Sequence, residues 1–211
     1  TNDHAIRDNT YYLGMYSGIE NNETGYRFLY IELLDENAFI TFKAVQGVFH
    51  YMDLEYKGTF KCSDDRLNQI WDTAAYTAHL NMQEYLWDGI KRDRLVWIGD
   101  MAPEVMALTT LYGRMSVIER SLDFVRDQTP LPGWMNGYPM YSMWWIIILA
   151  DYYEKTGARA FVNKQIDYLK GLIKQISDHV DENGELKYSF LFVDWQFALS
   201  LLVVTPVIFV F

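Results

Sequence analysis

The sequence predicts a mainly helical protein that is preceded by a β-rich segment. The first 60 residues contain runs rich in β-branched and aromatic residues, and in the middle run apolar and polar side chains alternate with the period of a half-buried strand. After Gly58, apolar residues recur every three or four positions, which is the period of a helix. All 7 tryptophans lie from Trp71 to Trp195, in the helical part. This order indicates two segregated units, a β unit followed by an all-α unit.

Three runs rich in β-branched and aromatic residues make up the first unit. They are Tyr26–Leu34, Ala38–Val45 and Val48–Tyr56. A polar stretch at 35–37 and Gly47 separate the runs, and short links of this kind are typical of antiparallel strands. We therefore expect residues 1–60 to be the C-terminal part of a β-sandwich domain.

Five helices are predicted in the second unit. We expect the first to begin at Ser63 as its N-cap, because acidic residues follow in the first turn. The second helix is expected at about Met101–Tyr112, with Asp100 near its cap, and the third begins after Ser116. The fourth is expected at Pro139–Thr156, and the fifth follows an apolar stripe. The stripe consists of Val162, Ile166, Leu169, Ile173, Ile176 and Val180. Helices that follow one another through loops are typical of antiparallel pairs, as in bundles and helical toroids.

Composition excludes several functional classes. The chain has 18 Lys and Arg against 28 Asp and Glu, a net charge of −10, so the basic surface that nucleic acid requires is not expected. Cys62 is the single cysteine, which excludes a disulfide framework and a thiolate metal site within one chain. The four histidines do not pair at metal-ligand spacing, so we expect no metal and no cofactor.

The last residues differ from the rest in composition. Residues 198–211 are almost wholly apolar and uncharged, but they are fewer than the roughly 20 residues that span a membrane, and Pro206 interrupts them. We interpret residues 196–211 as an aberrant hydrophobic tail, the out-of-frame or chimeric end of a truncated gene. A short membrane anchor is the weaker alternative, and otherwise no membrane partner is expected. The N-terminal residues show no signal-peptide pattern.

The segment Glu84–Glu104 has the composition of a binding loop. It holds eight charges in 21 residues, and Trp87 and Trp97 lie among them. Carboxylates and guanidinium groups bind sugar hydroxyls, indole rings pack on sugar faces, and paired carboxylates carry out glycoside hydrolysis. The alternative is a solvated loop with minor ion pairs, in which Asp100 is only a helix cap.

The same segment resembles the signature of the bacterial α-L-rhamnosidases, glycoside hydrolase family 78. Residues 88–100 read Asp-Gly-Ile-Lys-Arg-Asp-Arg-Leu-Val-Trp-Ile-Gly-Asp, which is similar to the family pattern Asp-Cys-Pro-x-Arg-Asp-Glu-Arg-x-x-Trp-x-Gly-Asp. The stretch 58–71 resembles the family's entry into its first barrel helix, and 192–195 resembles a later Gly-Asp-Trp element. The resemblance spans roughly residues 26–195.

The resemblance implies a fold and a set of roles. The fold is a partial (α/α)6 toroid over residues 61–195, preceded by the end of a β-sandwich. The implied reaction is hydrolysis of terminal α-L-rhamnose with inversion, on a carbohydrate partner, in the periplasm or cytoplasm of a bacterium. The residues that match the signature, or that we expect to line the sugar pocket, are Asp88, Arg92, Trp97, Asp100, Trp134 and Trp195.

The general acid is the point of departure from the family. This chain has Asp93-Arg94 where the family has Asp-Glu-Arg, and the missing residue is the usual acid. We expect Asp93 to take that role, with Glu104 from the next helix as the alternative. The general base of an inverting pair is expected further along the chain, so we expect an incomplete, inactive fragment. The alternative function is a non-catalytic carbohydrate-binding remnant.

Overall fold

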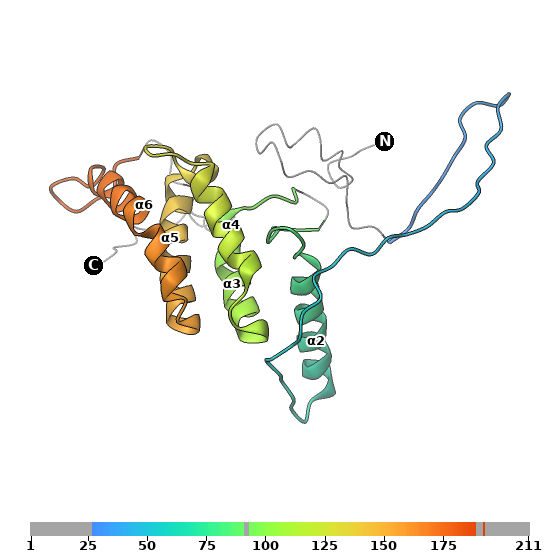
Figure 1. Ribbon diagram of the computed structural model, residues 1–211, viewed down its shortest axis with the longest axis horizontal. Helices are drawn as coiled ribbons and strands as arrows, with labels where there is room; N and C mark the ends of the chain where they lie inside the picture. The colour runs from blue at the N-terminus through green and yellow to red at the C-terminus, as the bar shows by residue number, and fades with distance from the viewer. Residues whose placement is uncertain (1–26, 91–92, 189–191, 193–211) are drawn as a thin grey trace.

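The computed structural model describes residues 27–90, 93–188 and 192, and it confirms a mainly helical chain. Figure 1 shows the helices gathered in one body, from which the N-terminal described residues extend away. The elements are α2 Asp65–Leu80, α3 Ile98–Tyr112, α4 Ser116–Asp127, the 3₁₀ turn η2 Met135–Gly137, α5 Pro139–Thr156 and α6 Arg159–Ser177. The predicted range of α5 is confirmed, and the others differ at their ends.

The first helix begins one residue later than predicted. Asp64, and not Ser63, is the N-cap, and its carboxylate accepts hydrogen bonds from the backbone N–H groups of Arg66 (2.8 Å) and Leu67 (3.3 Å). A carboxylate caps as well as a hydroxyl and adds a charge that the helix dipole favours. The buried Asn68 also exchanges two side-chain hydrogen bonds with the backbone of Cys62, which fixes the entry into the helix.

The core lies between α3, α4, α5 and α6. The central helix α3 packs against both α2 and α5, and α5 packs in turn against α6. Trp145 of α5 is fully buried and donates from its indole N–H to the Leu122 carbonyl of α4 (3.2 Å). The buried Tyr152 hydroxyl bonds both the N–H and the carbonyl of Met115, so α5 also sets where α4 begins.

The predicted stripe on α6 is not the side that packs most deeply. The buried residues are Phe161, Gln165 and Leu172, whereas Ile173 of the predicted stripe is 47% exposed. The buried set is rotated by one residue, about 100°, from the predicted one. The rotation has a polar cause that hydrophobic periodicity does not detect: Gln165 donates to Asp123 (2.8 Å) and accepts from Arg126, both on α4.

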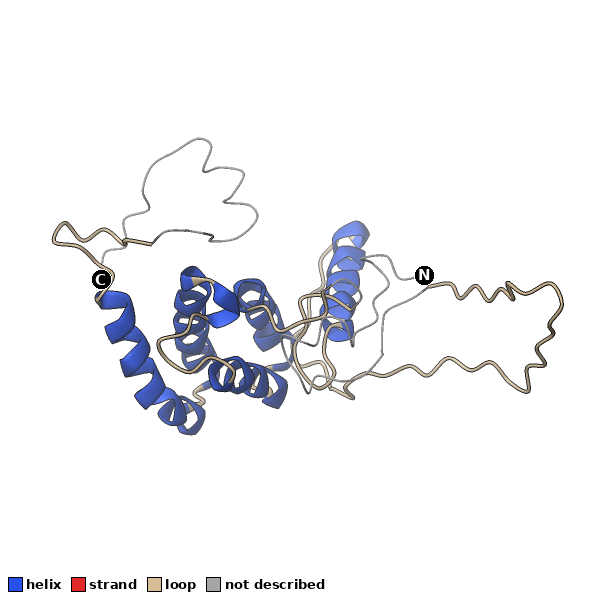
Figure 2. Ribbon diagram, turned by 90° about the horizontal axis from the view of Figure 1, so that it is seen from above, coloured by secondary structure: helices blue, strands red, loops and turns tan. Residues whose placement is uncertain are grey.

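The predicted strands at 26–34, 38–45 and 48–56 are not confirmed. The structure assigns no strand within residues 27–63, and large apolar side chains such as Phe28, Phe39 and Val48 are exposed there. A strand is defined by ladder hydrogen bonds to a partner, and this described stretch has no ladder. Figure 2 shows it as an extended loop beside the helical body.

The end of this extended stretch is fastened to the helices. The N–H groups of Lys57 and Gly58 both donate to the Leu111 carbonyl at the end of α3, at 2.7 and 2.9 Å. Over the described part of the chain, no helix combines the length and the apolar character that a membrane crossing requires. The predicted tail at 196–211 lies outside the described residues.

Candidate active site at the start of α3

The signature segment forms a closed loop that leads into α3. Asp88 closes its base twice: its carboxylate accepts from the Leu95 N–H (2.8 Å), and its own N–H donates to the Leu95 carbonyl (3.1 Å). Upstream, the Leu86 N–H donates to the buried Ser121 hydroxyl of α4 (2.9 Å). The loop is therefore attached to the helical core on the side that precedes Asp88. The two bonds of Asp88 hold the backbone at Asp88 next to the backbone at Leu95.

The predicted acid Asp93 lies in a strained turn. Asp93 and Arg94 have φ angles of +55° and +47°, and both are in the left-handed region that non-glycine residues rarely adopt. Such residues cost on the order of 1–3 kcal/mol each and persist where their surroundings hold them. Arg94 is buried, with its guanidinium carbon 4.9 Å from the centre of the Trp87 ring. This cation–π contact holds the turn on which Asp93 stands.

The first turns of α3 bring the predicted acids together. Asp100 lies in the first turn, near the N-cap residue Trp97, and Glu104 follows one turn later. Burial raises the pKa of Glu104 well above its usual range, and the charges of Asp100 and Asp88 raise it further. Asp88, Asp100 and Glu104 are therefore close enough to interact, and Glu104 holds its proton more tightly than a free carboxyl group.

Aromatic rings form a wall at the start of α3. Trp97 stands at the N-cap of α3, half-buried, with its ring edge-on to Tyr141 of α5 at 6.1 Å. Tyr141 also contacts Tyr138 and Phe192, which is the described part of the predicted 192–195 element. The Tyr141 ring lies directly against Gly99, where a Cβ atom would come within 2.5 Å of it. A glycine at this position allows the wall to approach the helix.

One asparagine holds the start of α3 from a distant loop. The Ile98 N–H donates to the Asn136 side-chain oxygen (3.0 Å), and the Asn136 amide donates to the Val96 carbonyl (3.1 Å). This long-range cap explains why α3 begins three residues before the predicted start. The acceptor lies 38 positions further along the chain, beyond the reach of a local capping rule.

Trp134, which we expected in the sugar pocket, makes its ring contacts elsewhere. Its ring is edge-on to His179 at 5.5 Å and to Tyr188 at 5.4 Å, on the loop that follows α6. Trp134 directly precedes η2, so it is joined to the start of α3 only through the loop that carries Asn136. Arg92 and Trp195 lie outside the described residues.

Three residues of this site were missed in the sequence: Arg94, Asn136 and Tyr141. Arg94 is one of three basic residues in the segment, and its position next to Asp93 and near Trp87 is the sequence signal that could identify it. The Asn136-Gly137 pair is a common turn signal, and Asn136 has a left-handed φ of +53°. Tyr141 carried no signal, because a tyrosine on an apolar helix is ordinarily a core residue.

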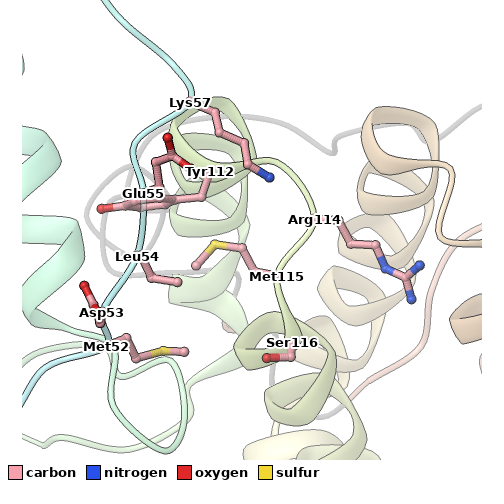
Figure 3. A pocket seen from close by; sticks show the side chains of 9 residues that line it. All are labelled: Met52, Asp53, Leu54, Glu55, Lys57, Tyr112, Arg114, Met115 and Ser116. Atoms are coloured by element: carbon pink, nitrogen blue, oxygen red, sulfur yellow. The ribbon is translucent and has the colours of Figure 1, made fainter.

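The structure also contains a cavity at the opposite end of α3. It has a volume of about 270 Å³, and Figure 3 shows side chains from two segments around it. Residues 52–55 and Lys57 form one side, and Tyr112 and residues 114–116 form the other. None of the residues that the signature predicts lines this cavity. Over the described residues, no group of three or more His, Cys, Asp or Glu side chains is arranged to hold a metal ion.

Comparison with known proteins identifies the family of the chain. Residues 55–200 match the bacterial α-L-rhamnosidase six-hairpin glycosidase domain. The crystal structure of the GH78 family rhamnosidase of Bacillus sp. GL1 is similar, with a TM-score of 0.61 and 26% sequence identity over 69% of this chain. The matched part amounts to 16% of that rhamnosidase's length. No curated protein matches the chain. The chain belongs to the bacterial α-L-rhamnosidase family of glycoside hydrolases, through a six-hairpin glycosidase domain that includes the acids at the start of α3.

Proposed function

We propose that the start of α3 is the sugar-binding, acid-bearing part of an inverting α-L-rhamnosidase site. The observation that carries the proposal is the order of residues at the start of α3. Trp97 is its N-cap, Asp100 and Glu104 follow on consecutive turns, and Asp88 closes the loop that leads into the helix. Carboxylates accept hydrogen bonds from the hydroxyls of a sugar, and the indole ring packs against its apolar face. The substrate class is a glycan or glycoside with a terminal α-L-rhamnose.

Asp93 is proposed as the general acid, and Glu104 is the alternative donor. The strained turn at Asp93 is held by the buried Arg94, an arrangement that fixes the direction of the neighbouring carboxyl group. Glu104 has the property that an acid needs near neutral pH, because its raised pKa keeps a proton on the carboxyl group. One of its oxygens is buried without a hydrogen-bond partner among the described residues. This burial favours a role beneath the site rather than contact with the departing glycoside.

The remaining predicted residues are proposed to bind the sugar. In this proposal Asp88 and Asp100 accept hydrogen bonds from the sugar hydroxyls, and Trp97 covers one face of the sugar ring. Arg92 is proposed as a sugar ligand from its match to the signature, and Trp195 from the resemblance of 192–195 to the later Gly-Asp-Trp element. Trp134 is proposed as an outer contact, since its ring packs on the loop after α6.

The proposed domain plan follows the resemblance. Residues 61–195 form the first part of an (α/α)6 toroid, residues 1–60 belong to a β-sandwich, and 196–211 form the aberrant tail. An inverting mechanism also needs a general base about 6.5–9.5 Å from the acid, with a water between them. We place that base in a later part of the toroid. The 211-residue chain is therefore expected to bind rhamnose without hydrolysing a rhamnoside.

Calorimetric titration with L-rhamnose tests the site, with D-glucose as the comparison sugar. We expect measurable rhamnose binding that weakens at least about tenfold in Asp100→Asn, because one or two charge-assisted hydrogen bonds are lost. Asp178→Asn is the matched control, since it removes the same charge from the exposed end of α6. Equal affinities for both sugars, or no effect of Asp100→Asn, would contradict the proposal.

An assay with an aryl α-L-rhamnoside separates catalysis from binding alone. Binding without turnover is the expected result for this chain, and it agrees with the alternative of a carbohydrate-binding remnant. Turnover that disappears in Asp93→Asn would instead show that the chain contains a complete acid and base.

A further inference from the structure

The Asn136 carboxamide holds the backbone on both sides of Trp97. Its oxygen accepts from the N–H of Ile98, the residue after Trp97, and its amide group donates to the carbonyl of Val96, the residue before it. The two bonds are 3.0 and 3.1 Å long, and Val96 and Ile98 are fully buried. The direction in which Trp97 leaves the backbone is therefore fixed by one side chain.

The loop that carries Asn136 is itself rigidly held. Met135, its neighbour, is fully buried, and the Met135 N–H donates to the buried Ser142 hydroxyl of α5 (3.0 Å). The Gly137 N–H donates back to the Trp134 carbonyl (2.8 Å), which closes the turn around Asn136. Asn136 has φ +53° and ψ +17°, a conformation that asparagine and glycine tolerate better than other residues. The carboxamide is thus prearranged by α5.

Capping of α3 explains only one of the two hydrogen bonds of the Asn136 carboxamide. A helix cap needs an acceptor for a free N–H group, and the Asn136 oxygen supplies it to Ile98. The bond to the Val96 carbonyl has no part in capping, since Val96 precedes the helix. It restrains the peptide on the other side of Trp97, so the pair of bonds brackets that residue.

We propose that Asn136 is a positioning residue that sets the orientation of Trp97, and with it the first turn of α3 that carries Asp100, toward the bound sugar. This inference rests on the proposed function of the site. Because both peptides beside Trp97 are already fixed, Trp97 loses little side-chain and backbone entropy when the sugar binds. This preorganisation increases the affinity. Tyr141 supports the same ring from the side.

Two substitutions separate positioning from folding. Asn136→Gly removes both bonds but keeps the left-handed backbone conformation. Asn136→Asp keeps the acceptor for Ile98 and places a negative charge at a helix N-terminus, where the dipole favours it, but it cannot donate to Val96. Tyr168→Phe is the control, because it removes a comparable tie, from the Tyr168 hydroxyl to the Thr129 carbonyl (2.7 Å), far along α6.

The measurements are L-rhamnose affinity by calorimetry and the near-ultraviolet circular dichroism of the tryptophans, with Trp97→Phe to assign the Trp97 signal. We expect affinity to fall about tenfold in Asn136→Gly and about threefold in Asn136→Asp, and the Trp97 signal to weaken in both. Tyr168→Phe is expected to leave both readouts unchanged.

Each outcome has a separate meaning. If the unaltered chain does not bind rhamnose, the proposed function fails and the role of Asn136 fails with it. If the unaltered chain binds and the folded Asn136→Gly binds equally well, only the positioning role is wrong. If Asn136→Gly does not fold, Asn136→Asp decides: unchanged affinity and an unchanged Trp97 signal would reduce Asn136 to a helix cap.

Discussion

The two ends of α3 are held by similar contacts, but they differ in how many of their buried polar atoms have a hydrogen-bond partner. At each end, a segment distant in sequence forms hydrogen bonds with terminal backbone groups of the helix. At the start, the Asn136 side chain accepts from the Ile98 N–H. At the finish, the N–H groups of Lys57 and Gly58 donate to the Leu111 carbonyl. At each end a glycine allows the close approach, Gly99 under Tyr141 and Gly58 against the Thr110 carbonyl.

The start of the helix leaves more polar atoms unsatisfied. Three buried atoms there have no hydrogen-bond partner among the described residues: the indole nitrogens of Trp87 and Trp97 and one oxygen of Glu104. At the other end, a network of direct bonds runs through His79, whose Nε2 donates to the Met52 carbonyl (2.6 Å) and whose Nδ1 accepts from Tyr56 (3.3 Å). The Tyr112 hydroxyl is the buried exception at that end.

The difference favours a functional role for the start of α3 and a structural role for its finish. Unpaired buried polar groups cost stability, so a fold keeps them where they have another use. The finish of α3, with the cavity in Figure 3 beside it, joins the extended N-terminal stretch to the helices. The start combines strain at Asp93, unsatisfied atoms and gathered acids, which are the features of a functional site.

Of the substitutions that test this comparison, Gly99→Ala should have the largest effect on stability and binding. The new Cβ would lie 2.5 Å from two ring atoms of Tyr141, and that buried ring has little room to move. We expect a loss of about 2 kcal/mol in the free energy of unfolding, typical of overpacking, measured by urea denaturation, together with loss of rhamnose binding.

Gly171→Ala is the matched control for Gly99→Ala. It also adds a methyl group to a helical glycine, but the neighbour is the Leu131 Cδ1 atom at 2.5 Å, the end of a flexible side chain. We expect a change between zero and about 1 kcal/mol of added stability, from the better helix propensity of alanine. Equal losses in the two variants would show that Tyr141 does not constrain the start of α3.

Gly58→Ala should detach the extended N-terminal stretch from the end of α3 and leave the start of α3 unchanged. The Cβ atom would lie 2.2 Å from the Thr110 carbonyl oxygen, a backbone atom that cannot turn aside. We expect the two hydrogen bonds to Leu111 to be lost, at a cost of about 1 kcal/mol. Hydrogen exchange of the amides at 57 and 58 should become faster, while rhamnose affinity stays the same. A fall in affinity would show that the two ends are coupled.

The sequence predicts the helices well because their signals are local. Pro139 at the start of α5 and Gly157 at its end bound that helix as predicted. The acids of the site are also visible in sequence, since Asp88, Asp100 and Glu104 lie within 17 consecutive residues. Local rules fail where the partner is distant: Asn136 moves the start of α3, and Gln165 rotates the buried side of α6.

The predicted strands illustrate a different limit. Alternating side chains in residues 38–45 indicate how a strand would be oriented, but not whether it has a partner. Within residues 27–63 no ladder is formed, and the apolar side chains of that stretch remain exposed. The helices of the second unit bury their apolar faces against one another and need no outside partner.

The last prediction is a change in the pH dependence of stability, for Glu104→Gln. Burial, Asp100 and Asp88 raise the pKa of Glu104 in the folded chain above its value in the unfolded chain. Between those two pKa values the folded state binds more protons, so stability decreases as the pH rises from about 4.5. One proton limits this slope to about 1.4 kcal/mol per pH unit.

Glutamine keeps the shape of Glu104 and cannot lose a proton, so the variant should escape this decrease. Urea denaturation from pH 4 to pH 8 should give equal stabilities at the acidic end and a more stable Glu104→Gln at the neutral end. Glu154→Gln, on the exposed surface of α5, controls for the loss of one charge. Parallel stability curves for wild type and Glu104→Gln would show that Glu104 is solvated. The start of α3 would then lose the buried acid that distinguishes it from the other end.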